Sequence, residues 1–125
     1  MLDLNYYKNL PRKYTAAGVL LLNKENKILL VSPTYKDRWE IPGGLIEENE
    51  SLKAAAEREI KEELGLELNI SELLCVDYVA DYQGKGDNLQ FIFYGGVLSA
   101  EQINSIKLPA TELSEFRFFD QIILM

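Results

Sequence analysis

The chain has 125 residues, a formal net charge of −7 and no histidine. This length fits a single domain over residues 1–125, and the acidic balance argues against a nucleic-acid partner bound through a basic surface. The absence of histidine excludes Ser-His-Asp and Cys-His catalysis and histidine-ligated zinc within the chain, so any chemistry falls to carboxylates and a hard cation.

The N-terminal segment lacks the apolar stretch of a secretory signal, and no apolar run approaches the roughly 20 residues that span a membrane. We therefore expect a cytoplasmic protein with no membrane partner. The single cysteine, Cys75, has no partner for an internal disulfide, and its apolar neighbours in residues 73–76 predict a thiol buried in a strand. Oligomeric state is not fixed by these features, and a homodimer stays open.

The first third of the chain is typical of strands and turns. Apolar runs bounded by turn residues predict strands at residues 15–22 and 27–31, then a loop at 32–38 and a short extended piece at 39–41. Residues 42–44, with the sequence Pro-Gly-Gly, predict a sharp turn.

One long helix is predicted over residues 51–64. Ser51 or Asn49 can cap its first turn, and Gly65 ends it at the position where a left-handed backbone is usual. Beyond it, apolar runs predict strands at residues 68–80, 89–98 and 116–119, and Ser99-Ala-Glu-Gln102 resembles a capping box. Several strands around one or two helices predict a mixed α/β or α+β sandwich.

The predicted helix departs from an ordinary amphipathic pattern. At about 100° per residue, its apolar side chains share one arc, which should face the core. Glu59 and Glu63 lie within that arc, and Glu62 lies at its edge. Carboxylates are seldom buried unless they are paired or bind a metal, and three neighbours repel one another. Mg²⁺, which favours oxygen ligands, would resolve the repulsion; an exposed acidic helix edge supported by Glu–Lys pairs is the alternative.

Residues 44–66 read GLIEENESLKAAAEREIKEELGL and resemble the Nudix box, Gly-x5-Glu-x7-Arg-Glu-U-x-Glu-Glu-x-Gly-U, where U is a bulky aliphatic residue. Every defined position is filled, and residues 39–44 and the order of strands are also similar to the family. The resemblance implies an α/β/α sandwich around a mixed sheet. Because only residues 120–125 follow the last predicted strand, we expect the family's C-terminal helix to be absent or truncated.

The resemblance also implies roles for individual residues. The expected ligands of Mg²⁺ or Mn²⁺ are Glu59, Glu62, Glu63 and the backbone carbonyl of Gly43. The expected structural residues of the box are Gly44, Glu50, Arg58 and Gly65. Among these, Arg58 would pair with an acidic neighbour, Glu50, and so hold the box together.

By the same resemblance, the protein would be a metal-dependent hydrolase of a diphosphate linkage in a nucleoside diphosphate joined to another moiety. An activated water would attack phosphorus, and a carboxylate must accept its proton. Glu62, Glu63 and Glu112 are the candidates for that proton transfer. Glu112 resembles the distal glutamate of some family members in position, and an exposed loop carboxylate is its alternative.

The substrate stays open among ADP-ribose, nucleoside triphosphates, nucleotide sugars and dinucleoside polyphosphates. Tyr35, Trp39 and Tyr82 are suited to stack on a base, although core packing is the alternative for Trp39. The expected partner is thus a small nucleotide. The competing class is a Nudix-like module that senses a nucleotide without turnover, and an acidic metal-buffering domain is a more remote rival.

Overall fold

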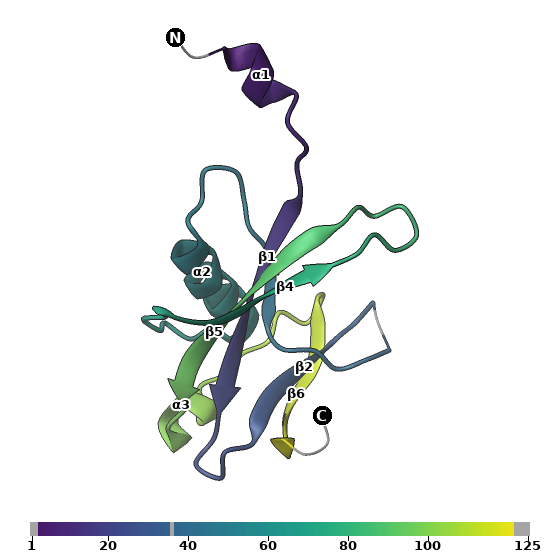
Figure 1. Ribbon diagram of the computed structural model, residues 1–125. Coiled ribbons are helices and arrows are strands. Elements are labelled where there is room, and N and C mark those ends of the chain that lie inside the picture. The colour runs from purple at the N-terminus through teal and green to yellow at the C-terminus, as the bar shows by residue number, and fades with distance from the viewer. Residues whose placement is uncertain (1–2, 36, 122–125) are drawn as a thin grey trace.

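The computed structural model describes residues 3–35 and 37–121. Its elements are, in chain order, α1 (Leu4–Lys8), β1 (Tyr14–Leu22), β2 (Ile28–Pro33), β3 (Gly43–Leu45), α2 (Leu52–Leu64), β4 (Glu72–Val79), β5 (Asn88–Val97), α3 (Ala100–Asn104) and β6 (Leu113–Phe119). The predicted mixed α+β architecture is confirmed (Figure 1). No helix within the described ranges is both long and apolar enough to cross a membrane.

The strands form one mixed sheet in the order β4-β5-β1-β2-β6, and β3 pairs with β1 outside this path. Strand β1 runs parallel to β5 along its whole length. It is antiparallel to β3 through residues 16–18 and to β2 only at the pair Leu22 and Ile28. The chain between β2 and β3 is tied back onto β2 by an isolated bridge between Val31 and Glu40. This arrangement places the turn before β3 beside the centre of β1.

Helix α2 packs its apolar side chains against one face of the sheet. Its buried apolar residues are Ala55, Ala56, Ile60 and Leu64. They meet a core from the strands that includes Val19, Leu21, Leu29, Val31 and Phe93. Each fully buried aliphatic side chain contributes about 1.5–3 kcal/mol to the free energy of unfolding. The packing therefore fixes the rotation of α2 about its axis, and with it the direction of its polar side chains.

Both ends of α2 agree with the sequence prediction. The hydroxyl of Ser51 accepts a backbone N–H of the first turn, and Gly65 adopts a left-handed φ of 73°. The backbone N–H of Lys107 donates to the carbonyl of Leu64 at 3.0 Å, so the segment after α3 closes the last turn of α2. The predicted capping box at the start of α3 is also present.

Two features differ from the sequence prediction. Helix α1, which no pattern predicts, has no buried residue and stands clear of the sheet on a stalk of residues 9–13 (Figure 1). Strand β4 begins at Glu72 instead of residue 68, and it forms an edge of the sheet in the described chain. The prediction that Cys75 is buried is therefore wrong: the strand is correct, but its edge position leaves the thiol exposed.

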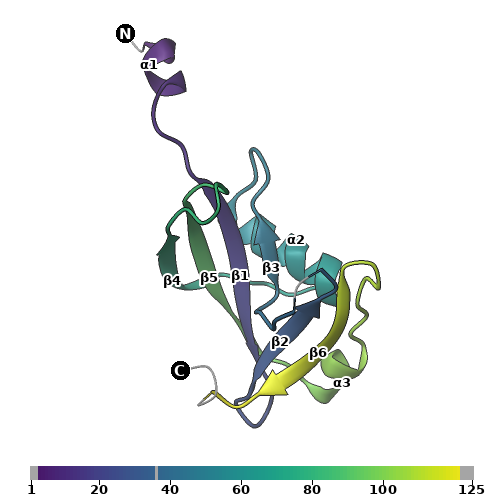
Figure 2. The ribbon, with the colours of Figure 1, turned by 90° about the vertical axis from the view of Figure 1, so that its right-hand side faces the viewer.

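The second helical layer of a sandwich is not seen within residues 3–35 and 37–121. Helices α2 and α3 lie on the same side of β1 and β5 (Figure 2), and Ile103 of α3 packs against the core that α2 covers. The prediction of an absent or truncated C-terminal helix falls on residues 122–125, which lie outside the described residues.

Candidate functional site

Two cavities adjoin the turn before β3, one beside helix α2 and the other beside strand β1. The first, of about 360 Å³, is called the acidic cavity because four carboxylates line it: Glu40, Glu59, Glu63 and Glu112. The second, of about 330 Å³, is called the side cavity, and its polar lining includes Arg38 and Gln90. They share the lining residues Tyr35, Glu40, Gly43 and Gly44. The two adjoining cavities are together called the cleft.

Glu59 and Glu63 lie one turn apart on α2, within the core-facing arc that the helical pattern predicts. Glu63 is 7% exposed, and its Oε1 accepts the backbone N–H of Gly43 at 2.9 Å. The side chain of Glu59 is also largely buried, and it lies close enough to Glu63 for each carboxyl group to shift the pKa of the other. Among the described residues, neither has a lysine partner, and both side chains are largely buried, so an exposed edge supported by Glu–Lys pairs does not describe these two residues.

The electrostatics of the pair follow from burial. Loss of water raises the pKa of Glu63 to about 8; the Gly43 N–H opposes the shift, and the charges of Glu59 and Glu40 add to it. Burial also raises the pKa of Glu59, against the opposing effect of Arg58. Two carboxylates in one dry site resist simultaneous ionisation. A proton or a cation must therefore accompany them at neutral pH.

These pKa shifts predict a pH-dependent stability for the metal-free protein. A carboxyl whose pKa is raised on folding stabilises the fold while protonated, so this stability is fully present below about pH 4.5 and is lost as pH rises through about 8. Between about pH 5.5 and 8.5, the free energy of unfolding in chelator should fall by on the order of 3 kcal/mol. Thermal unfolding of wild type and Glu63→Gln measures this. Most of the slope should vanish in the variant, and parallel curves would contradict the assignment.

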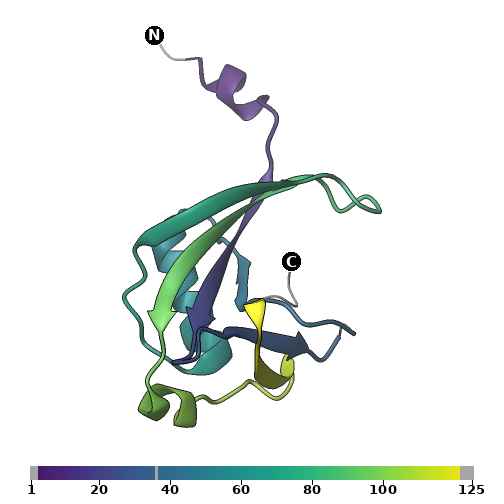
Figure 3. The same ribbon diagram turned by 60° about the horizontal axis from the view of Figure 1, so that its bottom comes forward.

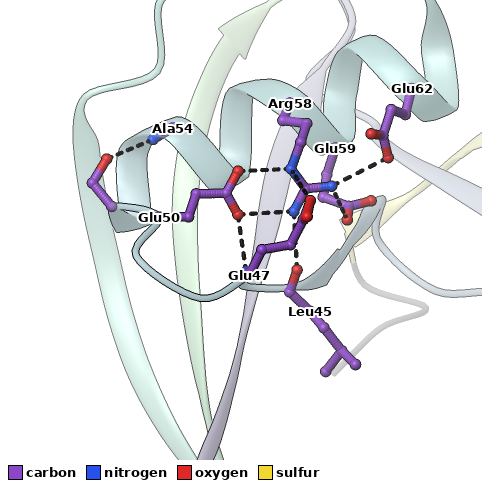
Figure 4. A network of polar contacts seen from close by, with 8 residues as sticks. Leu45, Glu47, Glu50, Ala54, Arg58, Glu59 and Glu62 are labelled. Carbon is purple, nitrogen blue, oxygen red and sulfur yellow. Dashed lines mark hydrogen bonds and ion pairs between the residues drawn. The ribbon is translucent and has the colours of Figure 1, made fainter.

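Glu62 is placed differently from the other two predicted ligands. Its side chain is 56% exposed, and its Oε2 lies 3.2 Å from Nη1 of Arg58 (Figure 4). In the described part of the chain, no three carboxylates are already arranged to hold a metal ion. A ligand role for Glu62 thus requires its carboxylate to turn away from Arg58 and toward Glu59 and Glu63.

The donor set nevertheless fits a hard divalent cation. Glu63 supplies a buried carboxylate and Glu59 a largely buried one, and Glu40 and Glu112 line the same cavity. All of these donors are oxygens, as Mg²⁺ and Mn²⁺ prefer. A cation between them would stabilise the charged carboxylates that burial disfavours.

Arg58 lies at the centre of an ion-pair network (Figure 4). Its Nε and Nη2 donate to the two oxygens of Glu50 at 2.7 and 2.9 Å, and Nε also lies 3.1 Å from Glu47. Its Nη1 donates to Glu59 at 2.9 Å, and Nη2 donates to the carbonyl of Leu45 at 3.1 Å. The Arg58 guanidinium, with the backbone N–H of Glu47, lowers the pKa of Glu50 to about 2. The side chain of Arg58 therefore joins the loop after β3 to Glu59, a carboxylate of the acidic cavity.

Two glycines allow the turn before β3 to approach both neighbours. A Cβ on Gly44 would lie 2.5 Å from Oε1 of Glu59, and a Cβ on Gly43 would overlap the carbonyl oxygen of Ala17. A side chain at either position would displace the turn. The close approach lets the Gly43 N–H reach Glu63.

The structure brings two more predicted residues to the cleft. Glu112 precedes β6, and its carbonyl accepts the backbone N–H of Thr34 at 2.9 Å. Thr34 is followed by Tyr35, which is 72% exposed and lines both cavities. The loops that carry Glu112 and Tyr35 are thus joined at the rim of the cleft.

Two predicted stacking residues lie elsewhere. The ring of Trp39 packs edge-on against Phe119 at 5.2 Å and beneath Arg117 at 5.3 Å, and it lines neither cavity. Tyr82 is 68% exposed in the loop between β4 and β5, and it also lines neither. Their placement gives no support to a stacking role in this cleft.

The sequence patterns miss three residues of the cleft. Glu40 lines both cavities, and its backbone makes two hydrogen bonds with Val31 at 2.8 and 3.0 Å. Its position in residues 39–44, beside the box, is a signal that could have identified it. Arg38 and Gln90 carry no such local signal. Gln90 lies on β5, where its Nε2 donates to the buried Asn88 at 2.9 Å.

Most of the chain is similar to known proteins. Residues 12–121 match the sequence profile of the NUDIX domain. An RNA pyrophosphohydrolase of Hydrogenovibrio crunogenus is 44% identical over 50 residues, which cover 40% of this chain and 30% of that protein. An ADP-ribose pyrophosphatase of Methanocaldococcus jannaschii is 34% identical over 103 residues, which cover 80% and 58%. The chain thus spans less than two thirds of either curated relative.

Solved structures of other proteins share this fold. The crystal structure of a MutT protein from Methanosarcina mazei superposes with a TM-score of 0.76 at 23% identity, over 94% of this chain and 86% of that one. At this identity the likeness concerns the fold alone.

Proposed function

The chain belongs to the NUDIX family, and on this premise we propose that it is a metal-dependent hydrolase of a diphosphate linkage in a small nucleotide. The observation that carries the proposal is the pair of neighbouring carboxyl groups of Glu63, which is buried, and Glu59, which is largely buried, in a cavity that adjoins the side cavity. Buried, neighbouring carboxylates suit a site that holds a cation and, through it, an anionic substrate.

We assign the binding of the cation to Glu59, Glu63 and the carbonyl of Gly43, with Glu62 joining once it leaves Arg58. When bound, Mg²⁺ or Mn²⁺ would neutralise phosphate charge, polarise phosphorus and acidify water. Without it, the acidic cavity and the net charge of −7 would repel a diphosphate. Arg58 and Glu50 have a positioning role, because they fix the loop after β3 against α2.

We assign proton transfer from the attacking water to Glu112. Glu59 and Glu63 are held by Arg58 and Gly43, whereas Glu112 reaches the acidic cavity from the loop before β6. A base on a separate wall of the cavity is free to accept a proton while the α2 carboxylates serve the cation. Glu62 and Glu63 remain the alternatives.

The side cavity would hold the rest of the nucleotide. Tyr35 and Arg38 offer a ring and a planar cation at its wall, and Gln90 offers an amide. The two curated relatives are named for RNA and for ADP-ribose. An acidic protein is poorly suited to the phosphate backbone of RNA, so we favour a small nucleoside diphosphate derivative.

A substrate panel tests the proposal. Metal-free protein should be inactive on ADP-ribose, nucleoside triphosphates, nucleotide sugars and dinucleoside polyphosphates, and titrated Mg²⁺ should switch on cleavage of at least one. Products from ¹⁸O-labelled water, identified by mass spectrometry, should carry the label on a single phosphate. A triphosphorylated RNA oligonucleotide serves as the nucleic-acid comparison. Full turnover in excess chelator would refute the metal requirement, and binding without product would favour a nucleotide sensor.

A further inference from the structure

Strand β4 presents an open, apolar edge. Seven of its eight residues are exposed, and its exposed apolar side chains, here called the β4 edge, are Leu73, Leu74, Val76 and Tyr78. Edge strands of soluble proteins are usually blunted by lysine, proline or a covering segment, because their free N–H and C=O groups invite pairing. β4 contains neither lysine nor proline. Its charged residues, Glu72 and Asp77, are both acidic.

The N-terminal arm, residues 3–13, presents a second surface that lacks cover. Leu4, Tyr6, Tyr7 and Leu10 are between 39% and 66% exposed, and no residue of α1 is buried. A helix of five residues is far too short to be stable in water alone, so it needs tertiary contacts. In Figures 1 and 3 it stands beyond the end of the sheet.

The two surfaces are complementary in charge. The arm contains Lys8, Arg12 and Lys13 against a single Asp3, so it carries a formal charge of +2. Lys13 already pairs with Asp87 and lies over the ring of Tyr78 in its own chain, so Lys8 and Arg12 are the cations that a second copy would meet. The whole chain carries −7, so the remaining residues carry −9. The arm is thus basic and aromatic, whereas the rest of the chain is acidic and the β4 edge is apolar and acidic.

We propose that the arm of one copy of this chain covers the β4 edge of a second copy, in a reciprocal two-fold dimer. An isologous dimer of this kind satisfies both surfaces of both copies with one type of contact. Moving the arm onto a second copy breaks no buried contact, because no residue of α1 is buried in the monomer. The inference does not depend on the proposed catalytic function.

The base of the arm favours a second copy over the chain's own β4. Lys13 forms an ion pair with Asp87 at 2.5 Å, and the hydroxyl of Tyr14 accepts a hydrogen bond from the buried Asn88 at 2.9 Å. These contacts fix the start of β1 with the arm directed away from the sheet (Figure 3). To reach its own β4, the arm would have to reverse direction within residues 9–12.

Sedimentation equilibrium from about 1 to 200 μM tests the dimer. The arm variant is Leu4→Ser/Tyr6→Ser/Tyr7→Ser, and the edge variant is Val76→Lys. Each should weaken dimerisation at least about tenfold. Val97→Lys is the matched control, since Val76 and Val97 are strand valines that are 48% and 50% exposed. It should dimerise as the wild type does, and circular dichroism should show all variants folded.

Mixing the two defective variants distinguishes the reciprocal exchange from other dimers. The edge variant keeps its arm and the arm variant keeps its edge, so the mixture should form heterodimers through one remaining contact. Direct pairing of two β4 strands would give no heterodimer, because one edge of the pair is always defective, and the arm variant would then pair with itself as the wild type does. A wild type that stays monomeric throughout, equal association of all variants, or a mixture without heterodimers would each overturn the proposal.

Discussion

Replacing Glu63 with glutamine should lower kcat by about 10²–10⁴-fold and leave the fold intact. Glutamine keeps the volume of the side chain, and its carbonyl oxygen can still accept the Gly43 N–H that Glu63 accepts at 2.9 Å. The substitution removes the negative charge that a cation requires. Because burial raises the pKa of Glu63 to about 8, the charged form is unfavourable in the metal-free fold. Above neutral pH, the variant should therefore be at least as stable as the wild type without metal.

Glu57→Gln is the matched control for this result. Glu57 lies on the same helix, but its carboxylate accepts from Lys53 Nζ at 2.7 Å and from the backbone N–H of Ile70 at 2.8 Å. The hydrogen bond from Lys53 and then that from Ile70 lower the pKa of Glu57, so its charge stabilises the fold. The control should lose stability and keep kcat. A Glu63→Gln variant with wild-type kcat and a large drop in Tm would identify Glu63 as purely structural.

Replacing Arg58 with lysine should lower both kcat and stability. Lysine cannot reproduce the bidentate pair with Glu50 together with the contacts to Glu59 and Leu45, because it has one nitrogen where arginine has a planar fork. The free energy of unfolding should fall by about 1–2 kcal/mol, and kcat by about 10–100-fold, since a residue that positions ligands has been lost. Calorimetry should still find the wild-type stoichiometry of bound Mg²⁺.

Arg117→Lys provides the comparison for that substitution. Arg117 is 61% exposed, pairs with Glu115 at 3.3 Å and lies over the ring of Trp39, away from the acidic cavity. Exposed pairs of this kind contribute roughly 0–1 kcal/mol, so the change should be nearly silent. Unchanged kcat and unchanged Mg²⁺ affinity in Arg58→Lys would show that the contacts of Arg58 with Glu50 and Glu59 do not position the ligands.

Local signals predict those parts of the fold that depend on neighbouring residues. Helix α2 begins after Ser51 and ends at Gly65 as predicted, because capping and left-handed backbone are properties of a few adjacent residues. The periodicity of α2 also predicts that Glu59 and Glu63 face the interior. Their location depends on the rotation of one helix, which its apolar side chains fix.

Local sequence signals do not predict features that depend on the order of the strands in the sheet. The exposure of Cys75 follows from the position of β4 at an edge, and nothing in residues 73–76 distinguishes an edge strand from a central one. Glu40 and Gln90 meet in the cleft because β1 lies between the turn before β3 and strand β5. Glu62 has the spacing of a ligand, but its direction is decided by competition with Arg58, which requires side-chain geometry.

The hydrogen bond from Lys107 to the carbonyl of Leu64 has a consequence for how the protein opens locally. Helix ends normally fray within their last turn, and the last turn of α2 contains Glu62 and Glu63. Fraying of that turn here also breaks the hydrogen bond to Lys107, so the opening of α2 is coupled to a segment far away in sequence. A cut or an insertion between α3 and β6 would then loosen the carboxylates of α2 without altering any residue of the cleft.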